Sequence, residues 1–223
     1  MSSNIALDYS KDMNPKFFDI RIKIIKRLIK EYKPDKVLDI GCGTGIFLDH
    51  FHDEFKSGTG IDGSIDMINF ANRNHKRKNI KYMIGKGNPL PFSDESFGLV
   101  LSMGTLEYVK DQKNHFEESI RVLKKNGILF LTTPTKIMNI YRIARLFGLA
   151  AARYWKINKY LSFDGLEGLV DNNSAEIIEH SVLFFNPSNI RLFDFFFNII
   201  GKTASGKLNK YLLGPQYVII RKR

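Results

Sequence analysis

The stretch Val37-Leu38-Asp39-Ile40-Gly41-Cys42-Gly43-Thr44-Gly45 decides how the rest of this chain is interpreted. Its first residues form a short, mostly apolar run that favours a β-strand, and the residues from Ile46 to His50 are compatible with a helix start. Glycine at alternate positions lets the backbone adopt positive φ and lets a ligand approach without meeting a Cβ atom. The first turn of a helix presents unpaired N–H groups. A plain glycine-rich turn is the alternative, but we expect a strand, turn and helix start that bind a nucleotide-like ligand.

The spacing of the glycines distinguishes between nucleotide cofactors. A dinucleotide site has the pattern Gly-x-Gly-x-x-Gly, whereas Ile46 stands where that third glycine would be. The run Asp39–Gly45 instead resembles the acidic-x-Gly-x-Gly-x-Gly signature of the class I S-adenosylmethionine (SAM) dependent methyltransferases. The resemblance implies SAM as the cofactor and S-adenosylhomocysteine as its product. An NAD oxidoreductase remains an alternative that rests on fold analogy alone.

A second acidic position supports this interpretation. The run from Gly58 to Asp62 is typical of a strand that ends in a carboxylate, and Asp62 lies about 20 residues beyond the glycines. One carboxylate can accept hydrogen bonds from both vicinal hydroxyls of a ribose. The alternative role is a helix N-cap, which either Asp62 or Ser64 could provide for a helix through Met67. We expect Asp62 to bind the ribose.

The resemblance continues through two further strands, with two departures. After a strand at 80–84, the segment 85–97 resembles the family's Gly-Asp-Ala-x-x-Leu-Pro-Phe pattern, but Lys86 stands where an acidic residue often meets the adenine amino group. Lysine has no acceptor atom for that group, so Gly87 and Asn88 are expected near adenine instead. After a strand at 97–103, the family often shows Leu-Glu-His-Val, and Tyr108 replaces the histidine. No catalytic residue is assigned.

The resemblance implies a cofactor site at the carboxyl ends of these strands. Within it, the three glycines border the methionine part of SAM, and Asp39 supports the loop and the amino-acid end. The complete set of expected cofactor-binding residues is Asp39, Gly41, Cys42, Gly43, Thr44, Gly45, Asp62, Gly63, Ser64, Met67, Gly87, Asn88, Ser102, Met103 and Tyr108. Methyl transfer by in-line displacement can rely largely on alignment of the two reactants, without a covalent intermediate.

At 223 residues, the sequence predicts one domain with a helical insertion. Residues 15–134 form the expected cofactor-binding half, which includes a helix at 15–32 with a solvated basic face, a helix at 112–125 and a fifth strand at 128–134. Residues 135–173 form the expected helical substrate lid, and 174–223 the C-terminal strands and a phenylalanine-rich helix at 187–200. By resemblance, the fold is an α/β, Rossmann-like seven-stranded mixed sheet sandwiched by helices, in which the last strand runs antiparallel between the fifth and sixth.

Composition limits the remaining possibilities. The formal net charge of +11 favours an anionic partner, and the basic, apolar insertion could contact a membrane surface or a carrier protein. No transmembrane segment or signal peptide is expected, and a single cysteine is consistent with the cytoplasm. The five histidines and Cys42 form no metal-binding pattern, so no metal is expected. His180 is expected to be a surface residue of a strand rather than a catalytic base.

We therefore expect a SAM-dependent methyltransferase with a small, apolar or lipid-linked acceptor. The Asn-Pro-Pro-Tyr type motif used on nucleobase amino groups is missing from the end of the strand at 97–103, so nucleic acid is not favoured. RNA or protein methylation remains the alternative because of the positive charge. A SAM-binding regulatory protein without turnover is a further alternative because of the departures at Lys86 and Tyr108.

Overall fold

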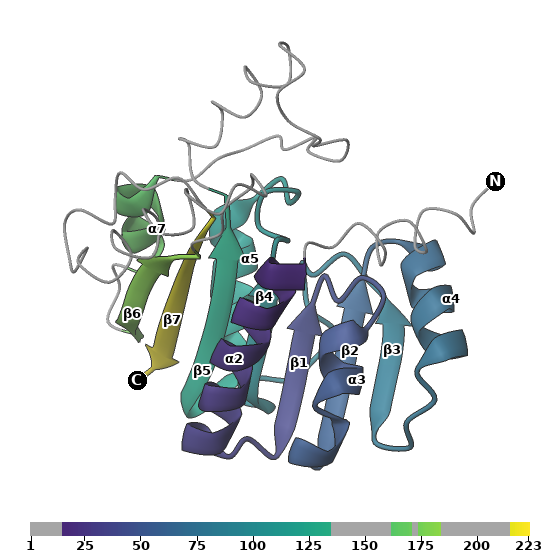
Figure 1. Ribbon diagram of the computed structural model, residues 1–223. Coiled ribbons are helices and arrows are strands. Elements are labelled where there is room, and N and C mark those ends of the chain that lie inside the picture. Colours follow the sequence, from purple (N-terminus) through teal and green to yellow (C-terminus); the bar gives the residue numbers. More distant parts are fainter. Residues whose placement is uncertain (1–14, 135–161, 171–173, 184–214) are drawn as a thin grey trace, which may run out of the picture.

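One mixed sheet of seven strands forms the centre of the protein (Figure 1). The computed structural model describes residues 15–134, 162–170, 174–183 and 215–223. The strands are β1 (Lys36–Ile40), β2 (Ser57–Asp62), β3 (Ile80–Ile84), β4 (Phe97–Met103), β5 (Leu123–Thr133), β6 (Ala175–Val182) and β7 (Gln216–Lys222). Their order is β3-β2-β1-β4-β5-β7-β6. The first five strands are parallel, and β7 lies antiparallel between β5 and β6, which confirms the predicted fold class.

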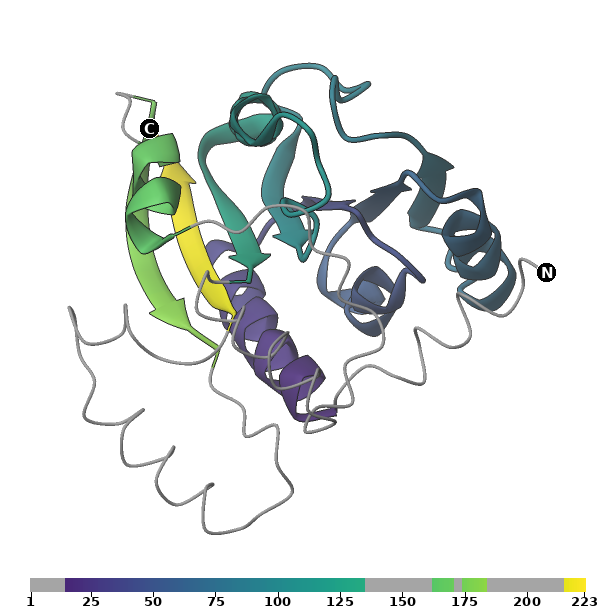
Figure 2. The same ribbon diagram turned by 90° about the horizontal axis from the view of Figure 1, so that it is seen from above.

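Helices cover both faces of the sheet (Figure 2). Helices α2 (Pro15–Tyr32), α3 (Ile46–His50) and α4 (Ile65–Asn74) contribute to one apolar layer, and α5 (Gln112–Arg121) and α7 (Phe163–Val170) contribute to the other. The central strands are therefore buried on both sides, and their apolar residues run almost without interruption instead of alternating with polar ones. Because β1 to β5 are parallel, their carboxyl ends all lie at the same end of the sheet. The glycine loop begins there, directly after β1.

The helix predicted at 112–125 is shorter than expected. Helix α5 ends at Arg121, and β5 already begins at Leu123. Val122 and Leu123 fit the apolar periodicity of the helix, but the backbone N–H groups of Ser96 and Phe97 both donate to the Val122 carbonyl, at 2.8 and 3.0 Å. Sheet pairing at this point ends the helix four residues early.

Two side chains expected at the surface are buried instead. Arg21 belongs to the basic side of α2, yet it is only 7% exposed and its Nη2 donates to Thr132 Oγ1 at 3.1 Å. The prediction of a fully solvated basic face is therefore wrong at Arg21. His180 on β6 is also covered: its Nδ1 lies 3.4 Å from Glu167 Oε1 of α7, and its Nε2 lies 3.1 Å from Gln216 Oε1 of β7. The helix packed over this edge strand explains why His180 is not a surface residue.

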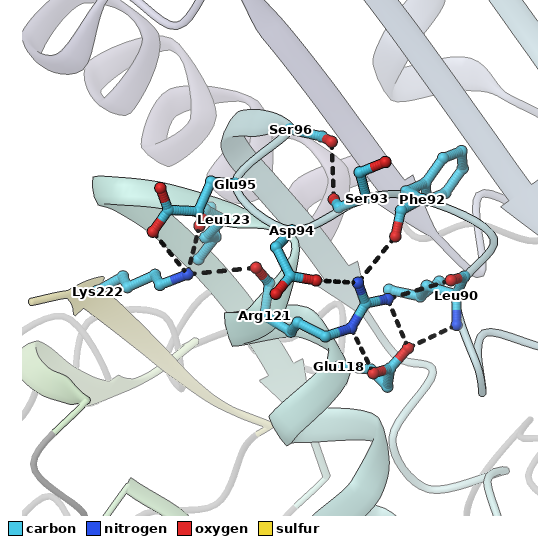
Figure 3. Close-up of polar contacts among 10 residues, drawn as sticks. All are labelled: Leu90, Phe92, Ser93, Asp94, Glu95, Ser96, Glu118, Arg121, Leu123 and Lys222. Carbon is cyan, nitrogen blue, oxygen red and sulfur yellow. Dashed lines mark hydrogen bonds and ion pairs between the residues drawn. The ribbon is translucent and has the colours of Figure 1, made fainter.

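The loop between β3 and β4 is attached to α5 by Arg121 (Figure 3). The guanidinium group forms two hydrogen bonds with the Glu118 carboxylate, at 2.6 and 2.9 Å, and also donates to the carbonyls of Phe92 and Leu90 and to Asp94. Glu118 in turn accepts the Leu90 N–H at 2.7 Å. We call these residues, Leu90, Phe92, Asp94, Glu118 and Arg121, the Arg121 cluster. These bonds hold the Leu-Pro-Phe segment against the end of α5.

Several predicted elements lie outside the described residues. These are most of the expected lid at 135–173, of which α7 is described, and the phenylalanine-rich helix at 187–200. None of the helices within the described ranges is long and apolar enough to cross a membrane.

Candidate cofactor site

The glycine loop after β1 adopts the backbone expected from its sequence. Gly41, Gly43 and Gly45 have φ of 72°, 54° and 80°, values that residues with a Cβ atom rarely adopt. A Cβ atom on Gly41 would lie 2.1 Å from Thr105 Oγ1, and one on Gly45 would lie 2.6 Å from the Tyr82 ring. At these two positions, glycine therefore makes room for neighbouring protein side chains. Those neighbours also bond to this segment, because Thr105 Oγ1 donates to the Ile40 carbonyl and the Tyr82 hydroxyl to the Gly45 carbonyl.

Asp62 at the end of β2 connects the glycine loop to the next helix. Its Oδ2 accepts the Gly43 N–H at 2.9 Å, and its Oδ1 accepts the Ser64 N–H at 2.8 Å. The N-cap of α4 is Ser64, whose Oγ accepts the Met67 N–H at 3.4 Å. Each carboxylate oxygen of Asp62 retains a second lone pair, so the geometry leaves acceptor capacity beside the loop.

A small cavity of about 10 Å³ lies next to the glycine loop. It is lined by Arg21, Asp39, Gly41, Cys42, Thr44, Ile46, Phe47 and Met103. Asp39 is 1% exposed, and its Oδ2 is buried with no hydrogen-bond partner among the described residues. Burial, reinforced by the nearby negative charge of Asp62, raises the pKa of Asp39 to about 7, and the positive charge of Arg21 opposes this shift. The cavity therefore pairs a buried cation with a buried carboxyl group whose Oδ2 has no partner within the described part of the chain.

A second buried carboxyl group lies at the ends of β4 and β5. Glu107 is 5% exposed and accepts a hydrogen bond of 3.4 Å from Thr133 Oγ1. Burial raises its pKa to about 7, although the hydrogen bond from its own backbone N–H, the charge of Arg21 and the hydroxyl of Thr133 all favour the ionised form. Gly104, with φ of 70°, separates this carboxyl group from the guanidinium: a Cβ atom there would lie 3.6 Å from Glu107 Oε1 and 3.8 Å from Arg21 Nη2.

Gly87, which is expected near adenine, lies close to a buried histidine, His115. Gly87 has φ of 70°, and a Cβ atom on it would lie 3.1 Å from Ile40 and 3.6 Å from His115 Nδ1. His115 is fully buried, and its Nε2 lies 3.0 Å from Ser102 Oγ. Burial lowers the pKa of His115 to about 4, so its imidazole is neutral at pH 7. Asn88 is half-buried in the same loop, whereas Lys86 is exposed.

The remaining predicted residues fall into a buried and an accessible group. Cys42, Thr44 and Met103 are buried and line the cavity beside Asp39. Burial and the two nearby aspartates raise the pKa of the Cys42 thiol, so this cysteine is not a thiolate nucleophile at neutral pH. Met67 is half-buried, and Gly63 and Tyr108 are exposed. All of them lie in the segments that follow β1, β2 and β4 or at the ends of those strands.

Besides Glu107, sequence reasoning missed four side chains that shape this region. These are Arg21, Tyr82, Thr105 and His115, which lie 20 or more residues from Gly41, Gly43 and Gly45 and carry no local motif. One signal was available for Arg21. The residues three and four positions before and after it in the helix are all apolar (Phe17, Phe18, Ile24 and Ile25), so Arg21 shares its helix face with apolar side chains and is a candidate for burial. Nothing in the sequence indicates that Tyr82 and Thr105 occupy the space left by two glycines.

A larger hollow at the opposite end of the sheet has different chemistry. Its volume is about 570 Å³, and it is lined by Lys26, Ile29, Lys30, Lys33, Pro34, Asp35, Asp53, Glu54, Phe55 and Lys56. These residues belong to α2 and to the segments that precede β1 and β2, whereas ligands of parallel α/β sheets bind beyond the carboxyl ends. No group of three or more His, Cys, Asp or Glu side chains suited to a metal ion occurs in the described part of the chain.

Comparison with known families identifies the glycine-loop fold. Residues 38–131, which run from β1 almost to the end of β5, match the family model described as a methyltransferase domain. The match over these residues supports a class I SAM-dependent methyltransferase. SAM is the cofactor of this family.

Individual proteins are similar to this chain over part of their length. The ubiquinone biosynthesis O-methyltransferase of Pelagibacter ubique is 33% identical over 149 residues, which cover 62% of this chain and 60% of that protein. An uncharacterized protein of Methanocaldococcus jannaschii is 34% identical over 128 residues, or 56% of this chain and 57% of that protein. The chain thus spans about three-fifths of the length of these curated relatives. A SAM-dependent methyltransferase of Thermotoga maritima shares the fold, with a TM-score of 0.58, 23% identity and coverage of 84% of this chain and 81% of that one.

Proposed function

We propose that this protein transfers the methyl group of SAM to a small, largely apolar acceptor that carries a hydroxyl group. The main support for SAM as the cofactor is the hydrogen bond between Asp62 and the glycine loop. In this bond, Asp62 Oδ2 accepts the Gly43 N–H. It brings the two motifs of a nucleoside site together at one sheet edge. Asp62 would hold the ribose, and Gly87 and Asn88 would border the adenine.

The two buried charged residues beside the loop fit the amino-acid end of SAM. The α-carboxylate needs a cation, which Arg21 supplies, and the α-ammonium group needs an anion, which Asp39 supplies. A cation close to Asp39 would favour the ionised form of this carboxyl group and would give its buried Oδ2 a partner. The donor set therefore fits a zwitterion better than it fits an uncharged ligand.

The chemistry that bound SAM supplies is a methyl group on a positively charged sulfur, which is displaced in line by the acceptor. The residues around the loop hold the cofactor rigidly, because Thr105 and Tyr82 fix the backbone on both sides of it. Rigid alignment of two reactants can supply much of the rate without a covalent intermediate.

An oxygen acceptor is favoured by the Pelagibacter relative, whose name describes an O-methyltransferase. The apolar acceptor class rests on composition, because residues 135–173 and 184–200 are rich in aromatic and aliphatic side chains. The net charge of +11 favours a second candidate, methylation of RNA or of an acidic protein. A polynucleotide substrate would bind with an affinity that falls steeply as salt rises, whereas a small neutral acceptor would not show this dependence.

Calorimetric titration with SAM, S-adenosylhomocysteine and NAD tests the cofactor. We expect both SAM species to bind and NAD not to bind; preference for NAD, or binding of neither SAM species, would overturn the proposal. Transfer of a labelled methyl group from SAM to 4-methylcatechol and 4-octylcatechol tests turnover and the preference for an apolar tail. Binding without transfer to either phenol would instead favour the regulatory alternative.

A truncated ligand tests the amino-acid end. 5′-Methylthioadenosine has the nucleoside part of S-adenosylhomocysteine but lacks the carboxylate and ammonium groups. We expect Arg21→Met to weaken S-adenosylhomocysteine by about 10- to 150-fold, the scale of a hydrogen bond to a charged group, and to leave 5′-methylthioadenosine unchanged. Arg27→Met is the matched control, because Arg27 lies on the same helix but is 49% exposed and pairs with Glu179. Equal weakening of both ligands would refute the role of Arg21.

A further inference from the structure

Four polar side chains form a buried cluster at the carboxyl ends of β4 and β5. Arg21 comes from α2, Glu107 from the loop after β4, and Thr132 and Thr133 from the end of β5; they are 7%, 5%, 0% and 1% exposed. Ligands in parallel α/β folds bind beyond these strand ends. The glycine loop follows β1 on one side of β4, and the cluster lies at the ends of β4 and β5 on the other side. An acceptor that binds beyond the ends of β4 and β5 would therefore meet this cluster.

The contacts within the cluster fix the Glu107 carboxyl group. Thr133 Oγ1 donates to Oε2, while Arg21 Nη2 donates to Thr132 Oγ1. The charged group that acts on Glu107 from α2 is Arg21, and β5 contributes the hydroxyl of Thr133. Oε1 faces Gly104, where the absence of a side chain keeps the carboxyl group close to the backbone at the end of β4. Oε2 thus accepts from Thr133, the backbone N–H of Glu107 also donates to the carboxylate, and Oε1 faces the end of β4.

A purely stabilising role explains this arrangement poorly. Burying a guanidinium group near a carboxyl group costs desolvation that the attraction between them often fails to recover, so well-packed apolar side chains would stabilise such a position at least as well. Arg21 also lines the cavity beside Asp39 and Met103, so the cluster is continuous with the methionine end of the cofactor site. Burial raises the pKa of Glu107 to about 7, which is the range in which a carboxylate exchanges protons effectively at neutral pH.

We propose that Glu107 is the proton acceptor of the methyl transfer, with Thr133 as the residue that positions its carboxylate. This inference rests on the proposed methyltransferase activity and on a hydroxyl acceptor. In the reaction, the acceptor oxygen forms a bond to the methyl carbon while the carbon–sulfur bond breaks, and its electron pair stays on sulfur to give the neutral thioether of S-adenosylhomocysteine. The hydroxyl proton moves to a carboxylate oxygen of Glu107, which later releases it to water.

The first test compares Glu107→Gln with Glu117→Gln, which makes the same chemical change at an exposed position of α5. Single-turnover transfer from SAM to 4-methylcatechol and 4-octylcatechol is measured from pH 5.5 to 9, together with the dissociation constant of SAM. For the wild type and Glu117→Gln we expect a rate that rises with pH and levels off above a midpoint near 7. For Glu107→Gln we expect a rate at least about 100-fold lower without that midpoint, and SAM affinity within about threefold of wild type.

Thr133→Val provides a second measurement, because it removes one hydroxyl at nearly constant volume. The hydrogen bond from Thr133 favours the ionised carboxylate, so its loss raises the pKa of Glu107. The midpoint of the rate profile should move to higher pH while the plateau rate at pH 9 changes little. A merely structural role would lower the plateau and leave the midpoint in place.

The outcomes separate this inference from the proposed function. Failure of the wild type to bind SAM would overturn the proposed function itself. A wild-type protein that binds SAM but methylates neither catechol would overturn the hydroxyl acceptor and the role of Glu107 with it. Transfer by Glu107→Gln within threefold of wild type, or an equal loss of SAM binding and transfer, would overturn the role of Glu107 alone.

Discussion

Asp62 Oδ2 accepts the backbone N–H of Gly43 at 2.9 Å, so a side chain at the end of β2 fixes the loop that follows β1. The second oxygen of the same carboxylate accepts the Ser64 N–H, at the start of α4. Two motifs that lie about 20 residues apart in the sequence therefore form one rigid unit. The conformation of the glycine loop and the position of the expected ribose contact depend on each other.

Asp62→Asn tests this unit. The amide offers only one acceptor oxygen, so its NH2 group would face a backbone N–H and the loop would lose a fixed point. We expect binding of both S-adenosylhomocysteine and 5′-methylthioadenosine to weaken by about 1–3 kcal/mol, because the ribose is common to the two ligands. Calorimetry measures both affinities. The control is Asp53→Asn, whose side chain is 86% exposed, and unchanged affinities for Asp62→Asn would refute the ribose assignment.

Gly41→Ala and Gly63→Ala form a matched pair for stability. Gly41 has positive φ, and its new methyl group would lie 2.1 Å from Thr105 Oγ1, whereas Gly63 has open space with only the Gly85 carbonyl at 4.0 Å. The backbone strain and the overlap at Gly41 should together destabilise the fold by about 2–4 kcal/mol. Gly63→Ala should change stability by less than about 1 kcal/mol. Urea unfolding of the two variants and the wild type checks the difference, and equal stabilities would contradict the structure of the loop.

Arg121→Met should destabilise the protein by about 1–3 kcal/mol, because it removes a partly buried ion pair and leaves the Leu90 and Phe92 carbonyls without their donor. The hydrogen bond from Arg121 holds the pKa of Glu118 below its usual value. A carboxyl group with a lowered pKa stabilises the fold above its unfolded pKa of about 4.3, and this contribution is lost as the pH falls through the folded pKa.

The penalty for Arg121→Met should therefore shrink as the pH falls below about 4. Denaturant unfolding at pH 7, 5 and 3 measures this dependence. Arg73→Met, an exposed substitution in the last turn of α4, is the control and should have little effect at any of the three values. A penalty for Arg121→Met that stays constant down to pH 3 would show that the ion pair with Glu118 does not contribute.

Asp39 should have the opposite effect on stability as the pH changes. Its pKa is raised to about 7 in the folded protein, above the unfolded value of about 3.9, so folding favours the protonated form. Ionisation therefore destabilises the fold progressively from about pH 4 to pH 7. Asp39→Asn should gain stability relative to wild type over this interval, by on the order of 3 kcal/mol. Unfolding free energies of the variant and the wild type, measured at pH 4.5 and 7, test this prediction. A stability difference that does not change with pH would mean that Asp39 is ionised throughout this interval.

The sequence predicted secondary structure best where a segment's conformation depends on residues close to it in the chain. The strand, the glycine turn and the helix start at 37–50 follow from local apolar pattern and backbone freedom, and the structure confirms all three. Helix α5 shows the limit of such reasoning, because its end at Arg121 is decided by pairing between Leu123 and Phe97 of β4. A periodic pattern does not reveal which partner strand competes for the same backbone groups.

The same limit applies to the site. The glycines and Asp62 were predictable because their spacing is a local property of the chain. Arg21 and Glu107 were not assigned, because the roles proposed for them depend on burial at the same strand ends, although 86 residues separate them in the sequence. Burial changes the chemistry of a carboxyl group far more than the residues beside it in the sequence do.

The antiparallel β7 also constrains how the protein is made. Strand β5 ends at Thr133, but its partner β7 begins only at Gln216, so residues 134–215 are synthesised while one side of β5 is an unpaired edge. Strands β1 to β4 can pair during this time, whereas the row of free N–H and C=O groups on β5 can pair with other chains. The interval between the synthesis of β5 and β7 is therefore when a nascent chain of this protein is most prone to aggregate, and when a chaperone bound to β5 would help most.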